Sequence, residues 1–277
     1  MPSSLIMIAW PAGLPETVKN AGARAAVGAA THISHTVPEV HDGGEYYSAG
    51  TVQEDMNQEE RGDAMNPKQF LLLLALVASI RIGAAQATSF NFDTDAAEKP
   101  PSAFTSYATG GGPAGNWLVK EMADAQSGKH VVVQTDADRT DYRFPVLIAN
   151  QGEYSDLDLS AKAKSLSGQI DQGMGLVFRF RDPKSYYIVR ANALENNFRL
   201  YRMVNGRRLQ FAGANVKVAS GVWHTLRVVA KGDHIVCYFD GKPLIDSHDK
   251  TYTTGKIGLW TKADSVIAFD DLTVSAQ

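Results

Sequence analysis

The sequence predicts an all-β fold, a two-sheet antiparallel β-sandwich formed by residues 88–277. Three observations support this prediction. About a dozen short apolar segments in this region are separated by turn residues, at intervals of about 8 to 12 residues. None of these segments has a sustained helical periodicity. The region also has no fixed internal repeat, which argues against a propeller or a solenoid.

Residues 65–87 (MNPKQFLLLLALVASIRIGAAQA) predict a signal peptide. Lys68 supplies a positive charge, an apolar run of 11 residues follows it, and Ala85-Gln86-Ala87 matches an A-x-A cleavage site. A transmembrane helix needs roughly 18 to 20 apolar residues, and Arg81 interrupts this run. A buried core helix is the alternative, although such helices carry polar positions at helical spacing. We expect an exported protein, periplasmic or extracellular, with no transmembrane segment in its mature form.

Residues 1–64 predict a non-native or disordered extension. A signal peptide acts from the N-terminus, and Met65 is its natural initiator. The segment is rich in Ala, Gly and Pro and carries three basic residues against nine acidic ones. We therefore expect an over-extended reading frame or an unstructured leader, with residues 88–277 as one mature domain.

The composition of the mature region excludes some classes of partner and of stabilisation. It has 22 Lys and Arg against 21 Asp and Glu and no basic run, so we expect no nucleic-acid partner. Its single cysteine, Cys237, cannot form an internal disulfide. Cys237 lies in an apolar strand pattern, which predicts a buried and inert thiol.

The first half of the domain predicts strands joined by polar loops. Residues 89–93 alternate apolar and polar side chains, and residues 117–119 and 131–135 read as strands. Residues 156–163 (DLDLSAKA) place Leu157 and Leu159 on one face and Asp156 and Asp158 on the other.

The second half predicts hairpins with clear turn chemistry. Residues 175–181 and 186–190 flank the loop 182–185, and residues 198–204 and 207–211 flank Asn205-Gly206. Asp240-Gly241 marks a further turn, from residues 235–239 into residues 243–245. Residues 256–261 and 266–274 close the domain.

The hairpin register predicts which side chains share a face. If Arg181 pairs with Tyr186, then Phe180 faces Tyr187, and Phe178 and Phe180 both point to the core. If Val204 pairs with Arg207, then Leu200 meets Phe211 on the core face.

The opposite face of these hairpins collects arginines and aromatic residues. Guanidinium groups donate paired hydrogen bonds to hydroxyls and carboxylates, and aromatic rings stack on the apolar faces of sugars. We interpret the following residues as a ligand-binding face: Arg179, Arg181, Tyr186, Arg190, Arg199, Tyr201 and, from a later strand, Trp260. The alternative is a solvated sheet face on which the arginine stems cover apolar surface. On the first interpretation, replacing Arg179 and Arg190 by alanine weakens glycan binding without lowering thermal stability.

Three segments carry a resemblance to a known family. They are GLVFRFRDPKSYYIVRANALENNFRLYRMVNGRR, GVWHTLRVVAKGDHIVCYFDGKPLIDSHD and GKIGLWTKADSVIAFDDLTV. Together the region resembles the concanavalin-A-like, laminin-G-like jelly-roll proteins of bacteria, many of them described as 3-keto-disaccharide hydrolase domains or relatives of family 16 glycoside hydrolases. The fold that this implies serves lectins, hydrolases, lyases and adhesive modules. We expect an exported carbohydrate-binding module; the alternatives are a glycoside hydrolase and a structural or adhesive module of the cell envelope.

The resemblance also implies places for catalysis and for a metal. Retaining glycosidases use two carboxylates about 5 Å apart, and family 16 draws them from a Glu-x-Asp-x-x-Glu strand. The nearest segment here is EYSDLDLS, whose spacing departs from that pattern, so Asp156 and Asp158 are weak catalytic candidates beside the alternative of ordinary outward aspartates.

Jelly rolls of this type often hold a structural calcium between their terminal strands, and Asp93, Asp270 and Asp271 are weak candidates for its ligands. Solvated edge acids are the alternative. His224, His234 and His248 show no metal-ligand spacing, and we expect them to face solvent or to cap turns.

Overall fold

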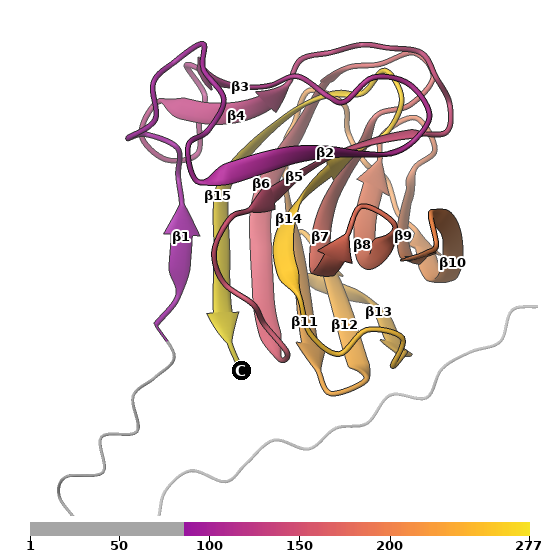
Figure 1. Ribbon diagram of the computed structural model, residues 1–277. Helices are drawn as coiled ribbons and strands as arrows, with labels where there is room; N and C mark the ends of the chain where they lie inside the picture. Colours follow the sequence, from indigo (N-terminus) through magenta and orange to yellow (C-terminus); the bar gives the residue numbers. More distant parts are fainter. Residues whose placement is uncertain (1–85) are drawn as a thin grey trace, which may run out of the picture. The chain divides into compact units, whose positions relative to one another are not determined.

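The structure is a computed structural model that describes residues 86–277 (Figure 1). The predictions for residues 1–64 and for all but the last two residues of the signal peptide lie outside the described residues. Within the described part of the chain, no helix is long and apolar enough to cross a membrane.

The described chain forms fifteen strands in two antiparallel sheets, which confirms the predicted β-sandwich. Sheet A has the order β13-β12-β11-β6-β15-β4-β3, with β1 paired to β15, and sheet B has the order β10-β9-β8-β7-β14-β5-β2. The strands are β1 (Thr88–Phe90), β2 (Phe104–Gly110), β3 (Trp117–Glu121), β4 (His130–Gln134), β5 (Arg143–Ala149), β6 (Leu157–Ser167), β7 (Gly173–Asp182), β8 (Ser185–Asn192), β9 (Asn197–Val204), β10 (Arg207–Asn215), β11 (Trp223–Lys231), β12 (His234–Phe239), β13 (Lys242–His248), β14 (Lys256–Thr261) and β15 (Val266–Ala276).

The main core lies between the two sheets. Leu157 and Leu159 of β6 point into it, as their alternation predicts, and Leu176 and Phe178 of β7 meet them from sheet B. Cys237 of β12 belongs to the same core and is fully buried, as predicted. Burial raises the pKa of its thiol, which keeps it protonated and unreactive.

Sheet B also buries much of its outer face, because its two edges approach each other at one end. Thr109 of β2 bonds through Oγ1 to the Pro183 carbonyl at 2.5 Å and to the hydroxyl of Tyr186 of β8 at 2.7 Å, although three strands separate β2 from β8. Tyr142, just before β5, donates its hydroxyl to the Gly206 carbonyl at the turn between β9 and β10, at 3.2 Å. These contacts close one half of the outer face of sheet B over a second apolar cluster.

The predicted register of the β7–β8 hairpin holds at its turn and is wrong along the rest of the two strands. Asp182 pairs with Ser185 and Phe178 pairs with Tyr187, with a bulge between these two pairs. Arg179 lies in the bulge with a φ of 48°, in the left-handed region that non-glycine residues rarely adopt. The bulge reverses the alternation, so Phe180 joins the outer cluster of sheet B instead of the main core.

The β9–β10 hairpin follows its prediction for the first four pairs. Val204 pairs with Arg207 as predicted, but a bulge then places Ala212, and not Phe211, opposite Leu200. Phe211 still packs against the main core.

Arg179 itself is fully buried and ties three chain segments together. Its guanidinium donates to the carbonyls of Ser155 at 2.7 and 3.0 Å, of Tyr252 at 3.0 Å and of Gly232 at 2.8 Å. Unpaired buried carbonyls are costly. These contacts contradict the expectation that removing Arg179 leaves stability unchanged.

Candidate functional site

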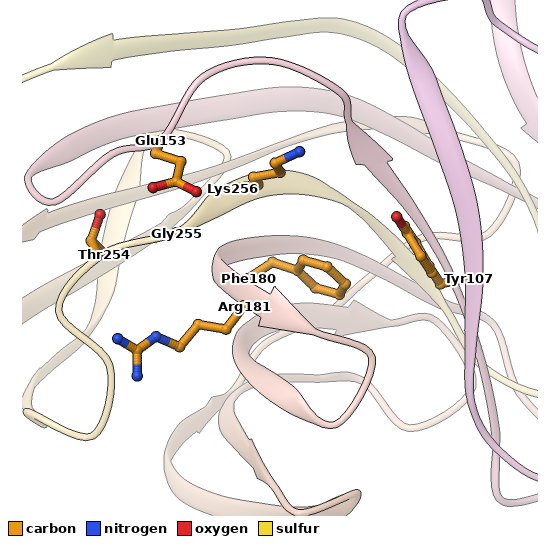
Figure 2. A pocket seen from close by; sticks show the side chains of 7 residues that line it. All are labelled: Tyr107, Glu153, Phe180, Arg181, Thr254, Gly255 and Lys256. Carbon is orange, nitrogen blue, oxygen red and sulfur yellow. The ribbon is translucent and has the colours of Figure 1, made fainter.

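The open half of the outer face of sheet B contains a cavity of about 360 Å³ (Figure 2). Its lining comes from β2, β7, β14 and the two loops that lead into β6 and β14. The lining residues are Tyr107, Glu153, Phe180, Arg181, Thr254, Gly255 and Lys256.

Local backbone features build this cavity. The bulge at Arg179 turns Phe180 outward, so that its ring lines the cavity and Arg181 follows at the exposed end of β7. Gly255 packs against the same bulge: a Cβ at this position would lie 2.5 Å from the Arg179 carbonyl carbon and from the Phe180 oxygen. Tyr154 and Gly255 exchange backbone hydrogen bonds of 2.9 and 3.2 Å, which holds the loop of Glu153 beside the loop of Thr254.

The cavity has an aromatic end and a polar end. Figure 2 shows the rings of Tyr107 and Phe180 at one end and Glu153, Thr254 and Arg181 around the other. The centroids of the Tyr107 and Phe180 rings are 5.5 Å apart. An aromatic wall beside a few polar groups is typical of sites that hold an amphipathic small molecule.

The charged groups of the cavity differ in whether they are already engaged with other parts of the protein. Lys256 donates through Nζ to the Asn150 carbonyl at 2.8 Å, so its ammonium is partly engaged. Arg181 and Glu153 are exposed, and the Arg181 guanidinium lies 5.9 Å from the centroid of the Tyr252 ring. A bound ligand therefore has a guanidinium and a carboxylate available for paired hydrogen bonds.

The structure divides the predicted ligand-binding residues into three groups. Arg181 lines the cavity. Tyr186, Arg190, Tyr201 and Trp260 are buried in or beside the closed half of the same face. Arg179 is a structural residue, and Arg199 is half-buried with its guanidinium on the Ala214 carbonyl at 2.6 Å and on Asn215 Oδ1 at 2.7 Å.

The closed half is packed by side chains. Trp260 stacks on Phe144 with centroids 5.4 Å apart, and the Arg208 guanidinium lies 4.7 Å from the Phe144 centroid and 4.8 Å from the Tyr201 centroid. Arg190 donates to Asn197 Oδ1 at 2.7 Å, to Glu195 at 2.8 Å and to the Tyr201 hydroxyl at 3.1 Å. Burial also raises the pKa of the Tyr186 phenol, so this hydroxyl stays neutral.

Asp156 and Asp158, the weak catalytic candidates, lie outside the cavity lining and have structural partners. Asp158 is on the outer face of sheet A, where it accepts hydrogen bonds from Arg227 Nε at 2.7 Å and Nη2 at 2.5 Å. Asp156 Oδ1 accepts from the backbone N–H of Gly232 at 2.8 Å. Glu153, the first residue of the same EYSDLDLS segment, is the carboxylate that does line the cavity. No catalytic role was predicted for it, because a loop residue shows no periodicity from which its direction could be predicted.

Asp93, Asp270 and Asp271 all accept hydrogen bonds from the segment that joins β3 to β4. Asp93 Oδ1 accepts from the backbone N–H groups of Lys129 and His130 at 2.9 and 3.0 Å, which lowers its pKa. Asp270 Oδ2 accepts from the N–H groups of residues 126 and 127 at 2.8 and 3.0 Å, and Asp271 accepts from a side-chain hydroxyl of the same turn. Burial still raises the pKa of Asp270. Among the described residues these three carboxylates do not converge as one ligand set, and calcium binding here stays a prediction.

Comparisons with known proteins agree with the sandwich. A family model described as "3-keto-alpha-glucoside-1,2-lyase-like domain" matches residues 105–275. The carbohydrate binding module CBM66 from Bacillus subtilis is similar in structure, with a TM-score of 0.51 and 19% identity over 63% of this chain and 96% of that chain. A putative glycosyl hydrolase from Parabacteroides distasonis gives a TM-score of 0.41 and 15% identity over 57% of this chain and 90% of that one.

Domain 4 of AbnA, an extracellular arabinanase from Geobacillus stearothermophilus solved with arabinotriose, gives a TM-score of 0.46 and 12% identity over 70% of this chain and 93% of that one. No curated protein matches the chain in sequence. At 19% identity, the match to CBM66 indicates a shared fold.

Proposed function

Since this chain belongs to the 3-keto-alpha-glucoside-1,2-lyase-like domain family, we propose that its β-sandwich binds an oligosaccharide in the cavity on the outer face of sheet B. The observation that carries the proposal is the division of this cavity into an aromatic end and a charged end. Tyr107 and Phe180 form the first, and Arg181 and Glu153 stand at the second.

A sugar ring matches this division. Its axial C–H groups form apolar patches that pack on aromatic faces, while its hydroxyls both donate and accept hydrogen bonds. Arg181 offers donors only and Glu153 offers acceptors only, so together they can satisfy a pair of neighbouring hydroxyls. The volume of about 360 Å³ is at the small end of the range for ligand sites, about 300 to 1,000 Å³, and suits one or two sugar units.

One further observation and one prediction support a carbohydrate module. The neighbour with the same fold, CBM66 from Bacillus subtilis, is named as a carbohydrate binding module. The signal peptide predicted for residues 65–87 supports export to the periplasm or beyond, where polysaccharides are met.

The family name favours a second candidate, a lyase. Elimination across C1 and C2 of a 3-keto-glucoside removes the C2 proton, which the neighbouring ketone acidifies, and breaks the C1–O bond as the C1–C2 double bond forms. The alcohol that leaves takes up a proton. Such a reaction needs a base near C2 and a positive group near the developing enolate oxygen. Glu153 and Arg181 provide these two functions in one cavity.

Retaining hydrolysis finds less support in this cavity. That mechanism needs two carboxylates about 5 Å apart, whereas the lining contains one, Glu153. A structural or adhesive module of the cell envelope is the remaining alternative.

Binding is tested by screening the full chain on a glycan array and measuring the best ligands by titration calorimetry. We expect Arg181→Ala to raise the Kd by about 10- to 100-fold, the equivalent of one charge-assisted hydrogen bond. Arg207→Ala is the matched control, since Arg207 is exposed on β10 and does not line the cavity. An equal Kd for wild type and Arg181→Ala would exclude this cavity as the binding site.

Turnover separates the enzyme from the binding module. A lyase converts a 3-keto-glucoside into a conjugated enone with ultraviolet absorbance, and Glu153→Gln should abolish this signal while retaining binding. Reducing sugar released without the enone would indicate a hydrolase. Binding without any product would indicate a binding module. If neither binding nor product is detected, the structural or adhesive role remains.

A further inference from the structure

We propose that His234, Asp246 and His248 form a binding site for a divalent first-row transition metal such as Zn²⁺ on the outer face of sheet A. The site lies on the opposite sheet from the proposed sugar cavity, so the proposal stands independently of that function. The spacing of these residues in the sequence does not predict the metal site, because they come from two strands.

The β12–β13 hairpin brings the three side chains together. His234 of β12 is directly opposite His248 of β13, and Asp246 precedes His248 by two residues, so all three project from one face. The two imidazole rings are stacked, with centroids 4.7 Å apart and planes 12° from parallel. His234 Nε2 lies 2.7 Å from Asp246 Oδ1, and one ligand atom from each residue lies within 4.8 Å of the others.

This donor set matches the chemistry of zinc and its neighbours. Two imidazoles and one carboxylate bind Zn²⁺, Fe²⁺ or Cu²⁺ and leave coordination positions for water or a ligand. With ligand distances of about 2.0 to 2.2 Å, the donor atoms around a tetrahedral ion are about 3.4 Å apart. The side chains of His234, Asp246 and His248 are 45%, 71% and 64% exposed, so small rotations toward an ion meet no packed neighbour.

A fourth residue supports the site from outside. His248 Nδ1 lies 3.1 Å from Asp233 Oδ1. A carboxylate on one ring nitrogen fixes the orientation of a metal-binding histidine and leaves the other nitrogen for the ion.

The apolar side of the same hairpin explains why these residues are free for binding. Ile235, Cys237 and Ile245 point into the main core and anchor β12 and β13. His234, Asp246 and His248 do not belong to that core, so they can be replaced without opening a cavity in it.

The test measures metal binding by the full chain, purified without a histidine tag. Because His32, His35 and His41 also lie in the chain, the reference protein carries asparagine at those three positions. Titration calorimetry with ZnCl₂ and the visible spectrum of bound Co²⁺ report the stoichiometry and the ligand field. We expect about one equivalent in the reference protein, and its loss in His234→Asn and in Asp246→Asn combined with His248→Asn.

Two further variants make the outcome specific. Lys242→Ala, on the same hairpin and exposed, is the matched control and should bind as the reference does. Asp233→Asn should weaken binding by about 10- to 100-fold, the usual effect of removing a carboxylate that orients a metal-binding histidine. Thermal unfolding in chelator checks that every variant is folded. An unchanged stoichiometry and Co²⁺ spectrum in His234→Asn, or no binding by the reference protein, would overturn the proposal.

Discussion

Arg179 and Arg181 stand two residues apart, and the structure gives them opposite roles. The Arg179 guanidinium makes four hydrogen bonds to three backbone carbonyls in a fully buried position, whereas Arg181 is exposed at the cavity. Hydrogen bonds to a charged group each contribute about 1.5 to 3 kcal/mol, and the cost of burying the guanidinium offsets part of this sum. Replacing Arg179 by methionine keeps the apolar stem and leaves the carbonyls of Ser155, Gly232 and Tyr252 without this donor. We therefore expect the free energy of unfolding to fall by about 3 kcal/mol.

Urea unfolding of the two single variants measures this difference. A loss of this size lowers the melting temperature by roughly 6 to 12 °C in a domain of 150 to 250 residues. Arg181→Met should change the free energy of unfolding by less than about 0.5 kcal/mol, as most surface substitutions do, while it weakens glycan binding. If Arg179→Met unfolds within 0.5 kcal/mol of the wild type, the bulge does not depend on these hydrogen bonds and the reasoning fails.

Three other predictions concern pH, the thiol and a glycine. Burial alone would raise the pKa of Asp264, but the backbone N–H groups of residues 169–171 outweigh burial and hold it below its usual value. Asp264→Asn should cost about 2 kcal/mol at neutral pH. The deficit should shrink as the pH falls below about 4, because the Asp264 carboxyl of the unfolded wild-type chain then takes up a proton while the native carboxylate stays charged. Urea unfolding at several pH values measures this, and a deficit independent of pH would contradict it. Cys237 should react with a thiol reagent only after unfolding, since it is fully buried; rapid labelling of the native protein would refute its place in the core. Gly255→Ala should lower the melting temperature and weaken glycan binding together, because its Cβ would lie 2.5 Å from the Phe180 carbonyl oxygen; a variant as stable as wild type would contradict the packing at the bulge.

The strands of the sandwich could be predicted because their turns have strong local chemistry. Asn205-Gly206 adopts left-handed backbone conformations at both positions and sets the pairing of Val204 with Arg207. The alternation of Leu157 and Leu159 likewise predicted the buried face of β6. These signals depend on only a few neighbouring residues, so they can be read from the sequence without knowing the order of strands in the sheet.

The faces near a bulge could not be predicted. The bulge at Arg179, where residues 179–181 of β7 lie opposite the single residue Tyr186 of β8, reverses the alternation and moves Phe180 from the expected core to the cavity. Arg179 carries no turn signal, since non-glycine residues seldom adopt its positive φ. The closed half of the outer face was missed for a different reason: the contact of Tyr142 with Gly206 depends on how far sheet B curls.

The pairing of His234 with His248 could not be predicted either, because it depends on a bulge in the β12–β13 hairpin. Phe239 pairs with Lys242 across Asp240-Gly241, and a regular register from there would place His234 opposite Ser247. The bulge between Cys237 and Tyr238 shifts the pairing by one residue and brings His248 opposite His234. Pro243, which has no backbone N–H to donate, lies within this irregular stretch, but it does not by itself specify the shift.

The most direct test of the sugar-binding cavity is the position of a bound oligosaccharide in a crystal of the full chain, soaked with the best ligand from the array. The account predicts a sugar ring packed on Tyr107 and Phe180, with its hydroxyls on Arg181 and Glu153. An oligosaccharide bound on the outer face of sheet A, or on any surface that leaves these four residues untouched, would contradict it.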